Sequence, residues 1–244
     1  MRPVRVAVNR LVAAATVPAA LIHIAVSGRV RPGSAGRVAA RWVRIVGRLT
    51  GVNFRSEGRM APPSGTMRVI VANHSSPLDI AALLAVEADV TFVAAGDLFR
   101  IPLLAAAMRA LRTVAVDRRS RHGVHLDLPP AIATPDLVLA VFPEGGIAAP
   151  GGRLPFRRSA FALAIGHGAV IVPVAIHASE QALPPRSGLG VRPATVTVEF
   201  LDPLPTAGLT LDDRRRLCDL AERRIGDALR RRRGEAPGVV GQAA

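Results

Sequence analysis

The sequence contains no lysine and no tyrosine, and it has only one cysteine and one tryptophan. With Cys218 as its single cysteine, the chain cannot form an internal disulfide, which is consistent with a reducing compartment. Aromatic residues make up 3% of the chain, whereas proteins that bind single-stranded nucleic acids use aromatic side chains to stack against bases. The composition therefore argues against that class of binder.

The sequence is also short of acidic residues. Its 32 basic residues, all arginine, face only 18 acidic ones, which gives a net charge of +14 and a pI of about 11.8. Half of the residues are hydrophobic, and the mean hydropathy of +0.31 is high for a freely soluble protein. Such a chain needs an anionic partner, which could be a phospholipid surface, a phosphorylated substrate or nucleic acid.

An uncharged run, LVAAATVPAALIHIAV, occupies residues 11–26 between arginines on both sides. It could be a signal peptide, a spanning helix, or a helix embedded in or lying along the cytosolic leaflet. The run is shorter than the ~20 residues of a spanning helix and contains Pro18 and His23. We therefore favour the leaflet-bound helix. Residues 38–52 form a second amphipathic stretch, which either joins the membrane contact or packs on the domain.

The remaining sequence alternates between short apolar runs and helical patterns, which predicts an α/β fold with a mixed, mostly parallel sheet covered by helices. We expect an N-terminal membrane-associated region, a catalytic domain and a C-terminal polar helix with a basic tail, at residues 1–56, 57–210 and 211–244. Strands are predicted at 67–72, 90–94, 113–117, 137–142, 170–177 and 195–200, and helices at 77–86, 101–111, 157–167 and 211–232.

Residues 68–79, RVIVANHSSPLD, are the most informative stretch of the chain. Its apolar half predicts a buried strand that ends at Asn73 and His74. Pro77 suits the first turn of a helix, and a serine just before it suits the N-cap. His74 then lies in a strand-to-helix turn, which is where open α/β sheets place their chemistry.

Asp79 follows His74 by five residues, so that its carboxylate can turn back towards the imidazole. A neutral imidazole is a good general base near pH 7, and a carboxylate on its other nitrogen would fix its tautomer. The alternative is structural: Ser76 and Asp79 also fit a capping box, with His74 only a polar loop residue. The amides at the start of the Pro77 helix are candidate oxyanion donors.

The Asn73-His74 pair with Asp79 resembles the first motif of the glycerolipid acyltransferases, the family of 1-acylglycerol-3-phosphate acyltransferases. A second block, GDLFRIPLLAAAMRALRTVAVDRR at 96–119, resembles that family's second motif. The resemblance implies that Arg118, and after it Arg100, hold the phosphate of an acceptor; the alternative is that both are solvated arginines. The family often has a basic residue where this chain has Gly96-Asp97.

The third block is VFPEGG at 141–146, which resembles the family's F-P-E-G signature. Here Phe142 would anchor the strand end in the core, and Glu144 would face acceptor hydroxyls or order a nearby arginine; the alternative is an ordinary turn after a strand. The family continues with Thr-Arg where this chain has Gly146-Ile147. Three later arginines are candidate substitutes, namely Arg153, Arg157 and Arg158.

The fourth block, VIVPVA at 170–175, resembles the family's apolar strand with a central proline, Pro173, which would line a substrate pocket. The resemblance covers roughly residues 67–205. Taken together, it implies His74 and Asp79 as catalytic residues, and it implies a substrate-binding set of Asn73, Arg100, Arg118, Glu144, Gly145, Gly146 and Pro173.

These motifs predict direct acyl transfer from acyl-CoA or acyl carrier protein to a lysophospholipid hydroxyl, most simply that of 1-acylglycerol-3-phosphate, at the cytoplasmic face of the cell membrane. The chain has no G-x-S-x-G elbow that would supply a nucleophilic serine. We expect no cofactor, no metal and no nucleic-acid partner. Two alternatives stay open: another acceptor, such as a lyso-ornithine lipid or other lysolipid, or a non-catalytic basic protein that binds membranes or nucleic acid.

Overall fold

The computed structural model describes residues 2–60, 65–117, 126–147 and 152–234. Within these ranges seven strands form one sheet in the order β1-β7-β6-β2-β5-β3-β4. Neighbouring strands pair in parallel, except for β6 and β7, which are antiparallel. The strands are β1 (Val52–Glu57), β2 (Arg68–Ala72), β3 (Val90–Ala95), β4 (Val114–Val116), β5 (Val138–Val141), β6 (Val170–His177) and β7 (Ala194–Phe200).

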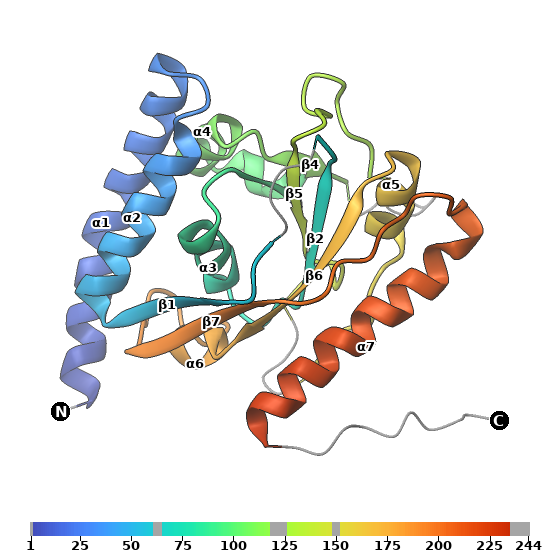
Figure 1. The fold of residues 1–244 in the computed structure, drawn as a ribbon. Helices are drawn as coiled ribbons and strands as arrows, with labels where there is room; N and C mark the ends of the chain where they lie inside the picture. The colour runs from blue at the N-terminus through green and yellow to red at the C-terminus, as the bar shows by residue number, and fades with distance from the viewer. Residues whose placement is uncertain (1, 61–64, 118–125, 148–151, 235–244) are drawn as a thin grey trace.

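Helices cover both faces of the sheet, with α1, α2 and α3 on one side and α5 and α7 on the other (Figure 1). Two 3-10 segments, η1 (Gly96–Arg100) and η2 (Leu211–Asp213), precede α4 and α7. The α-helices are α1 (Arg2–Val30), α2 (Ala35–Thr50), α3 (Leu78–Val86), α4 (Pro102–Ala110), α5 (Ser159–Gly166), α6 (Ser179–Ala182) and α7 (Arg214–Arg233).

Strand β2 shows why its sequence is apolar at every position after Arg68. Side chains alternate across a strand, so that Val69 and Val71 enter one core with α5 and α7, while Ile70 and Ala72 enter the other with α2 and α3. All four side chains are fully buried. A strand that is covered on both faces reads as a continuous apolar run, as is typical of parallel sheets. The end of β2 is therefore fixed rigidly in the middle of the molecule.

Helix α1 lies along α2 and α4 at one side of the domain. At Gly28, an added Cβ would lie 2.6 Å from the Cβ of Ala110, so only glycine permits this approach of α1 to α4. Among the described helices, α1 is the one long and apolar enough to cross a membrane, over Val4–Val30, and most of that stretch is not buried in the molecule. The prediction of an apolar N-terminal helix is confirmed.

The predicted fold class is confirmed, while several element boundaries differ. Helix α1 begins at Arg2, before the uncharged run, because arginine is a good helix former and does not end a helix. Strand β1 was not predicted, since most of its positions are exposed and polar. It pairs with β7 of the catalytic region, although the expected domain boundary lies within it, between residues 56 and 57. The four-residue α6 is too short to leave a periodic signal.

Candidate active site

The site forms where two neighbouring parallel strands end. Strands β2 and β5 pair from Arg68 with Val138 to Val71 with Val141. The carboxyl ends of parallel strands lie at the same edge of the sheet, so the turn after β2 and the turn after β5 are neighbours. As a result, His74 and Glu144 lie together although they are 70 residues apart in the chain.

The structure forms the His–Asp pair that the sequence predicts. The Nδ1 atom of His74 lies 2.9 Å from Oδ2 of Asp79 in the first turn of α3. Because a carboxylate can only accept, Nδ1 carries the proton, and Nε2 of the neutral ring keeps its lone pair. The Asp79 side chain is fully buried, while that of His74 is 14% exposed. The imidazole is therefore fixed at Nδ1 by a buried carboxylate, while part of the ring stays exposed.

Asp79 also caps the turn that carries His74. Its Oδ2 accepts hydrogen bonds from the backbone amides of Ser75 and Ser76, at 2.8 and 2.9 Å. The capping and dyad interpretations of Asp79 are thus both realised by one oxygen. The same contacts correct the expectation about oxyanion donors. The amides of Ser75, Ser76, Leu78 and Asp79 are already engaged within the turn and cannot face a substrate.

Phe142 packs against the hydrophobic core at the end of β5, as the sequence predicted, and it also contacts His74. Its ring is half-buried and stacks on the imidazole of His74, with centroids 4.2 Å apart and planes at 17°. Phe142 lies one residue after β5, at the position where the side chain reaches over the neighbouring turn. Its aromatic face gives the imidazole a flat, apolar wall that fixes the plane of the ring.

Asn73 binds the protein backbone. Its Nδ2 donates to the carbonyl of Ile176 at 3.0 Å, and its Oδ1 accepts from the amide of the same residue at 2.8 Å. Asn73 is 2% exposed. The side chain therefore ties the end of β2 to β6, and its predicted contact with substrate stays a prediction.

Glu144 is held in a similar way on the opposite side of the turn. Its Oε1 accepts from the amide of His74 and its Oε2 from the amide of Leu154, both at 3.0 Å. The side chain is buried, and this burial raises the pKa of Glu144, although the two amide bonds act in the opposite direction. Leu154 has no chemistry of its own, so no sequence signal pointed to its part in the site.

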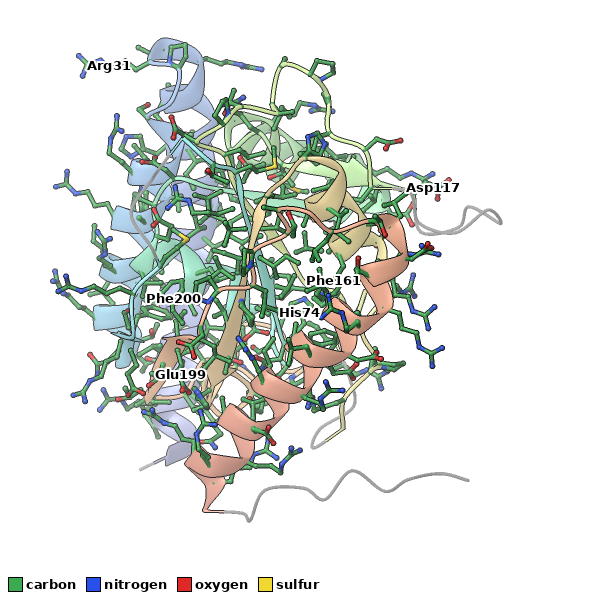
Figure 2. The ribbon with its side chains drawn as sticks, turned by 45° about the vertical axis from the view of Figure 1, so that its right-hand side comes forward. Arg31, His74, Asp117, Phe161, Glu199 and Phe200 are labelled. Atoms are coloured by element: carbon green, nitrogen blue, oxygen red, sulfur yellow. The ribbon has the colours of Figure 1, made fainter. Side chains whose placement is uncertain are left out.

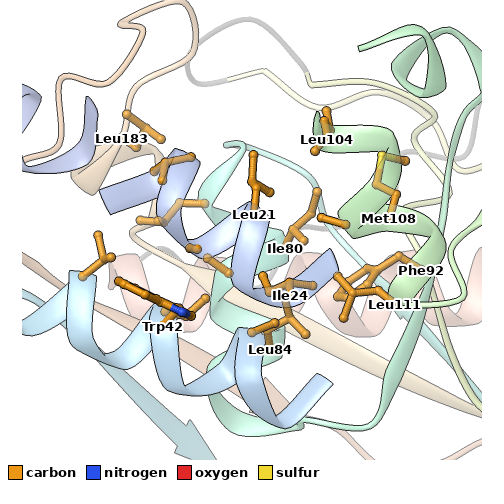
Figure 3. A pocket seen from close by; sticks show the side chains of 18 of the residues that line it. Leu21, Ile24, Trp42, Ile80, Leu84, Phe92, Leu104, Met108, Leu111 and Leu183 are labelled. Carbon is orange, nitrogen blue, oxygen red and sulfur yellow. The ribbon is translucent and has the colours of Figure 1, made fainter. Parts of the chain in front are cut away.

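Two adjoining cavities open beside His74. The first, of about 350 Å³, is lined by His74, Phe142, Gly145, Gly146 and Arg157 together with apolar residues. The second, of about 390 Å³, is almost wholly apolar and lies between α1, α2, α3 and α4 (Figure 3). Both are within the usual range for small-ligand sites. The residues that line both cavities are Ile80, Val93, Ala94, Leu98 and Phe142, so the two spaces adjoin.

Arg157 is the one guanidinium among the described residues that line the cavity of His74. It lies against Gly145, where an added Cβ would be 2.9 Å from Nε of Arg157. Gly145 has a φ of +70°, a backbone conformation that favours glycine, whereas the flexible Arg157 side chain could shift to admit a Cβ. Of the three arginines considered as substitutes for the missing Thr-Arg pair, Arg157 is the one in the cavity lining.

The other predicted residues lie elsewhere or outside the described ranges. Arg100 is 78% exposed, pairs with Asp97 at 3.4 Å and lines a separate cavity with Asp97 and Asp117. Arg118 falls outside the described residues. Pro173 is buried in β6, opposite Val71, and lines none of the cavities above. In the described part of the chain, no three His, Cys, Asp or Glu side chains are grouped to hold a metal.

Comparison with known proteins agrees with this geometry. The sequence model of the acyltransferase family matches residues 53–177. The chain is 29% identical over 176 residues to the mouse 1-acyl-sn-glycerol-3-phosphate acyltransferase alpha, covering 70% of this chain and 61% of that protein. It is 33% identical over 161 residues to the human beta enzyme, covering 64% and 57%. The chain thus spans about three fifths of the length of these relatives.

A solved structure has the same fold over its whole length. The crystal structure of the 1-acyl-sn-glycerophosphate (LPA) acyltransferase PlsC from Thermotoga maritima superposes with a TM-score of 0.73 at 19% identity, covering 98% of this chain and 100% of that one. The match includes the N-terminal helices as well as the sheet. Since the family match spans half of the chain and contains the His74, Asp79 and Glu144 motifs, the chain belongs to the acyltransferase family.

Proposed function

We propose that this protein transfers a fatty acyl group from a thioester donor, acyl-CoA or acyl carrier protein, to the hydroxyl group of a lysophospholipid. The observation that carries the proposal is the His74–Asp79 pair, whose imidazole lines a cavity that adjoins a second, apolar one. The names of the relatives indicate 1-acylglycerol-3-phosphate as the acceptor and phosphatidic acid as the product.

In this mechanism, Nε2 of His74 takes the proton from the acceptor hydroxyl as its oxygen attacks the thioester carbonyl. The tetrahedral intermediate collapses, the carbon–sulfur bond breaks, and the imidazolium returns the proton to the leaving thiolate. Asp79 holds Nδ1 and stabilises the imidazolium between the two steps. A positioned base supplies ~10²–10⁴-fold, and alignment of the two reactants supplies much of the rest.

The apolar cavity suits the acyl chain. Its walls are aliphatic side chains and aromatic rings that include Trp42, with helix α1 contributing Leu21 and Ile24 (Figure 3). Phe142 lines both cavities and touches the imidazole, so a chain in the apolar space would bring its thioester end to His74. Each methylene moved from water into such a space contributes about 0.8 kcal/mol.

Arg157 is the best-placed group for a phosphate on either substrate, because it shares the cavity with His74. Two basic residues that the family often carries are missing here, where this chain has Gly96-Asp97 and Gly146-Ile147. Recognition of a phosphorylated acceptor would thus depend largely on Arg157 and on the predicted Arg118. This reduced set of cations is the observation that favours a second candidate, transfer to another lysolipid.

The proposed location is the cytoplasmic face of the membrane. The outward side of α1 exposes Val4, Val8, Leu11, Ile22 and Val26, while its inward side packs on α2 and α4 and lines the apolar cavity. A helix held to the domain along one side is better suited to lie in the lipid–water interface than to cross the bilayer alone. This placement brings the apolar cavity close to lipid substrates.

The test is a release assay for free CoA thiol, using the purified protein in phospholipid vesicles with acyl-CoA and one acceptor at a time. Lysophosphatidate should give thiol and phosphatidic acid in equal amounts. Faster turnover of a lyso-ornithine lipid or another lysolipid would identify that lipid as the preferred acceptor, and the proposed acyl transfer would still hold. The protein could instead bind vesicles, with an affinity that falls steeply with salt, and release no thiol in response to an acceptor from either acyl-CoA or acyl carrier protein. That result would support the alternative of a non-catalytic basic protein.

A further inference from the structure

We propose that Glu144 is a positioning residue, whose carboxylate fixes the backbone of His74 and does not contact the acceptor. The inference rests on the proposed acyl transfer and assigns to this glutamate a part in the same site that differs from the substrate contact its motif suggests. It concerns how the imidazole is held at the cavity.

The direction of the side chain carries the first step. Of the described residues in this turn, Pro143 and Gly145 line the cavity beside His74, whereas Glu144 does not. Glu144 is 4% exposed, and each of its oxygens already accepts an amide hydrogen bond at 3.0 Å. The carboxylate therefore points away from the space in which an acceptor would lie.

The buried carboxylate of Glu144 is stabilised by backbone donors. Burying this side chain is unfavourable for the charged form, which raises the pKa of Glu144. The charge is compensated by two backbone donors, the amides of His74 and Leu154, which would otherwise lack acceptors at this place. One side chain thus accepts a backbone hydrogen bond from the turn after β2 and another from the segment that leads to α5.

The turn that carries His74 is held from the strands on both sides of β2. The sheet order places β2 between β6 and β5. On the β6 side, Asn73 holds both backbone groups of Ile176. On the β5 side, Glu144 holds the amide of His74. With Asp79 on Nδ1, the backbone and the ring of His74 are each fixed by a separate contact.

The same geometry predicts what substitution would do. In Glu144→Gln, the amide oxygen can accept only one of the two bonds, and the NH₂ group meets a backbone N–H instead of accepting from it. The His74 turn then loses a fixed point while the cavity lining stays unchanged. Because a misplacement near 1 Å costs about 10²-fold in rate, we expect kcat to fall by roughly that factor. The KM values for donor and acceptor should change little.

The experiment combines kinetics with amide hydrogen exchange on the full-length protein. In the wild type, the amides of His74 and Leu154 should exchange slowly. In Glu144→Gln, both should exchange faster, and kcat should fall at unchanged KM. Glu144→Asp keeps the charge but is too short to reach both amides, so it should behave in the same way. Glu199→Gln is the matched control, because Glu199 pairs with His177 and Arg231 away from the cavity, and it should keep wild-type kinetics.

Three results would overturn the inference: fast exchange of both amides in the wild type, a raised KM for the lysolipid with kcat kept in Glu144→Gln, or faster exchange in that variant with wild-type kcat. The exchange measurement needs no substrate. It therefore decides whether the carboxylate holds the two amides even if the wild-type protein transfers no acyl group. The thiol-release assay tests the acyl-transfer proposal separately.

Discussion

At the scale of single residues, Asp79 combines a structural cap with the contact to His74 that is proposed for catalysis. Its Oδ2 accepts from two backbone amides and from His74, whereas its Oδ1 is buried and has no hydrogen-bond partner among the described residues. The two oxygens are thus unequal. An amide in place of the carboxylate could keep the accepting oxygen and direct its NH₂ to the unused position.

Asp79→Asn therefore separates the two roles of the residue. The cap is kept, so the melting temperature should stay near that of the wild type, while kcat should fall by ~10²–10⁴-fold because a neutral amide stabilises the imidazolium poorly. Asp79→Ala removes the cap as well and should destabilise the fold by ~0.5–2 kcal/mol. Thermal unfolding and thiol release measure the two effects. Wild-type kcat in Asp79→Asn would show that the residue is only a cap.

The sequence was informative about this site to different degrees. The His74 and Asp79 geometry could be predicted, because both residues lie within one strand-to-helix turn whose conformation is local. The contacts of Asn73 with Ile176 and of Glu144 with Leu154 could not, because they join segments that only the sheet order brings together. Every residue type except proline offers the same backbone N–H and C=O groups, so the sequence does not reveal which of them a side chain binds.

At the scale of elements, long periodic segments were predictable and short or exposed ones were not. Strands β2, β3, β5 and β6 lie within a few residues of their predicted limits because burial on both faces makes them continuous apolar runs. Strand β1 is an edge strand with exposed polar positions, so its pairing with β7 follows from tertiary contacts. The length of α1 was underestimated because arginines were taken as its boundary.

Helix α1 gives a prediction at this scale, using two exposed leucines as a matched pair. Leu11 is 72% exposed on α1, and Leu211 is 53% exposed in η2, before α7 on the other face of the sheet. Leu11→Asp should weaken binding to anionic vesicles by roughly tenfold or more, since burying one leucine contributes ~1.5–3 kcal/mol. Leu211→Asp should leave binding unchanged. Vesicle co-sedimentation measures both, and equal effects would rule out α1 as the membrane contact.

At the scale of the whole molecule, the sheet separates two different sides. Helices α1 and α2 enclose the apolar cavity on one side, and α7 covers the other (Figure 1). The end of α7 is tied to the far edge of the sheet, where Arg232 bonds Glu57 of β1 at 2.6 Å and Thr197 of β7 at 3.0 Å. Figure 2 shows α7 running across this side with charged side chains along its outer face.

Cys218 reports whether α7 stays in place. Its thiol is 2% exposed and donates to the carbonyl of Phe156, and burial raises its pKa to about 12. At pH 8 the folded protein therefore presents a buried thiol rather than a thiolate, and alkylation by iodoacetamide should be slow. Unfolding in guanidinium lowers this pKa to its usual range and should give rapid labelling. Fast labelling of the native protein would contradict the packing of α7, and no other cysteine complicates the readout.

The most direct test of the central claim is the acceptor-dependent release of CoA thiol by wild-type protein and by His74→Ala, each in vesicles that contain lysophosphatidate. In the proposed mechanism the ring of His74 removes the proton, so the substitution should lower kcat by ~10²-fold or more while vesicle binding and the melting temperature are kept. A folded His74→Ala protein that transfers the acyl chain at the wild-type rate would contradict the mechanism.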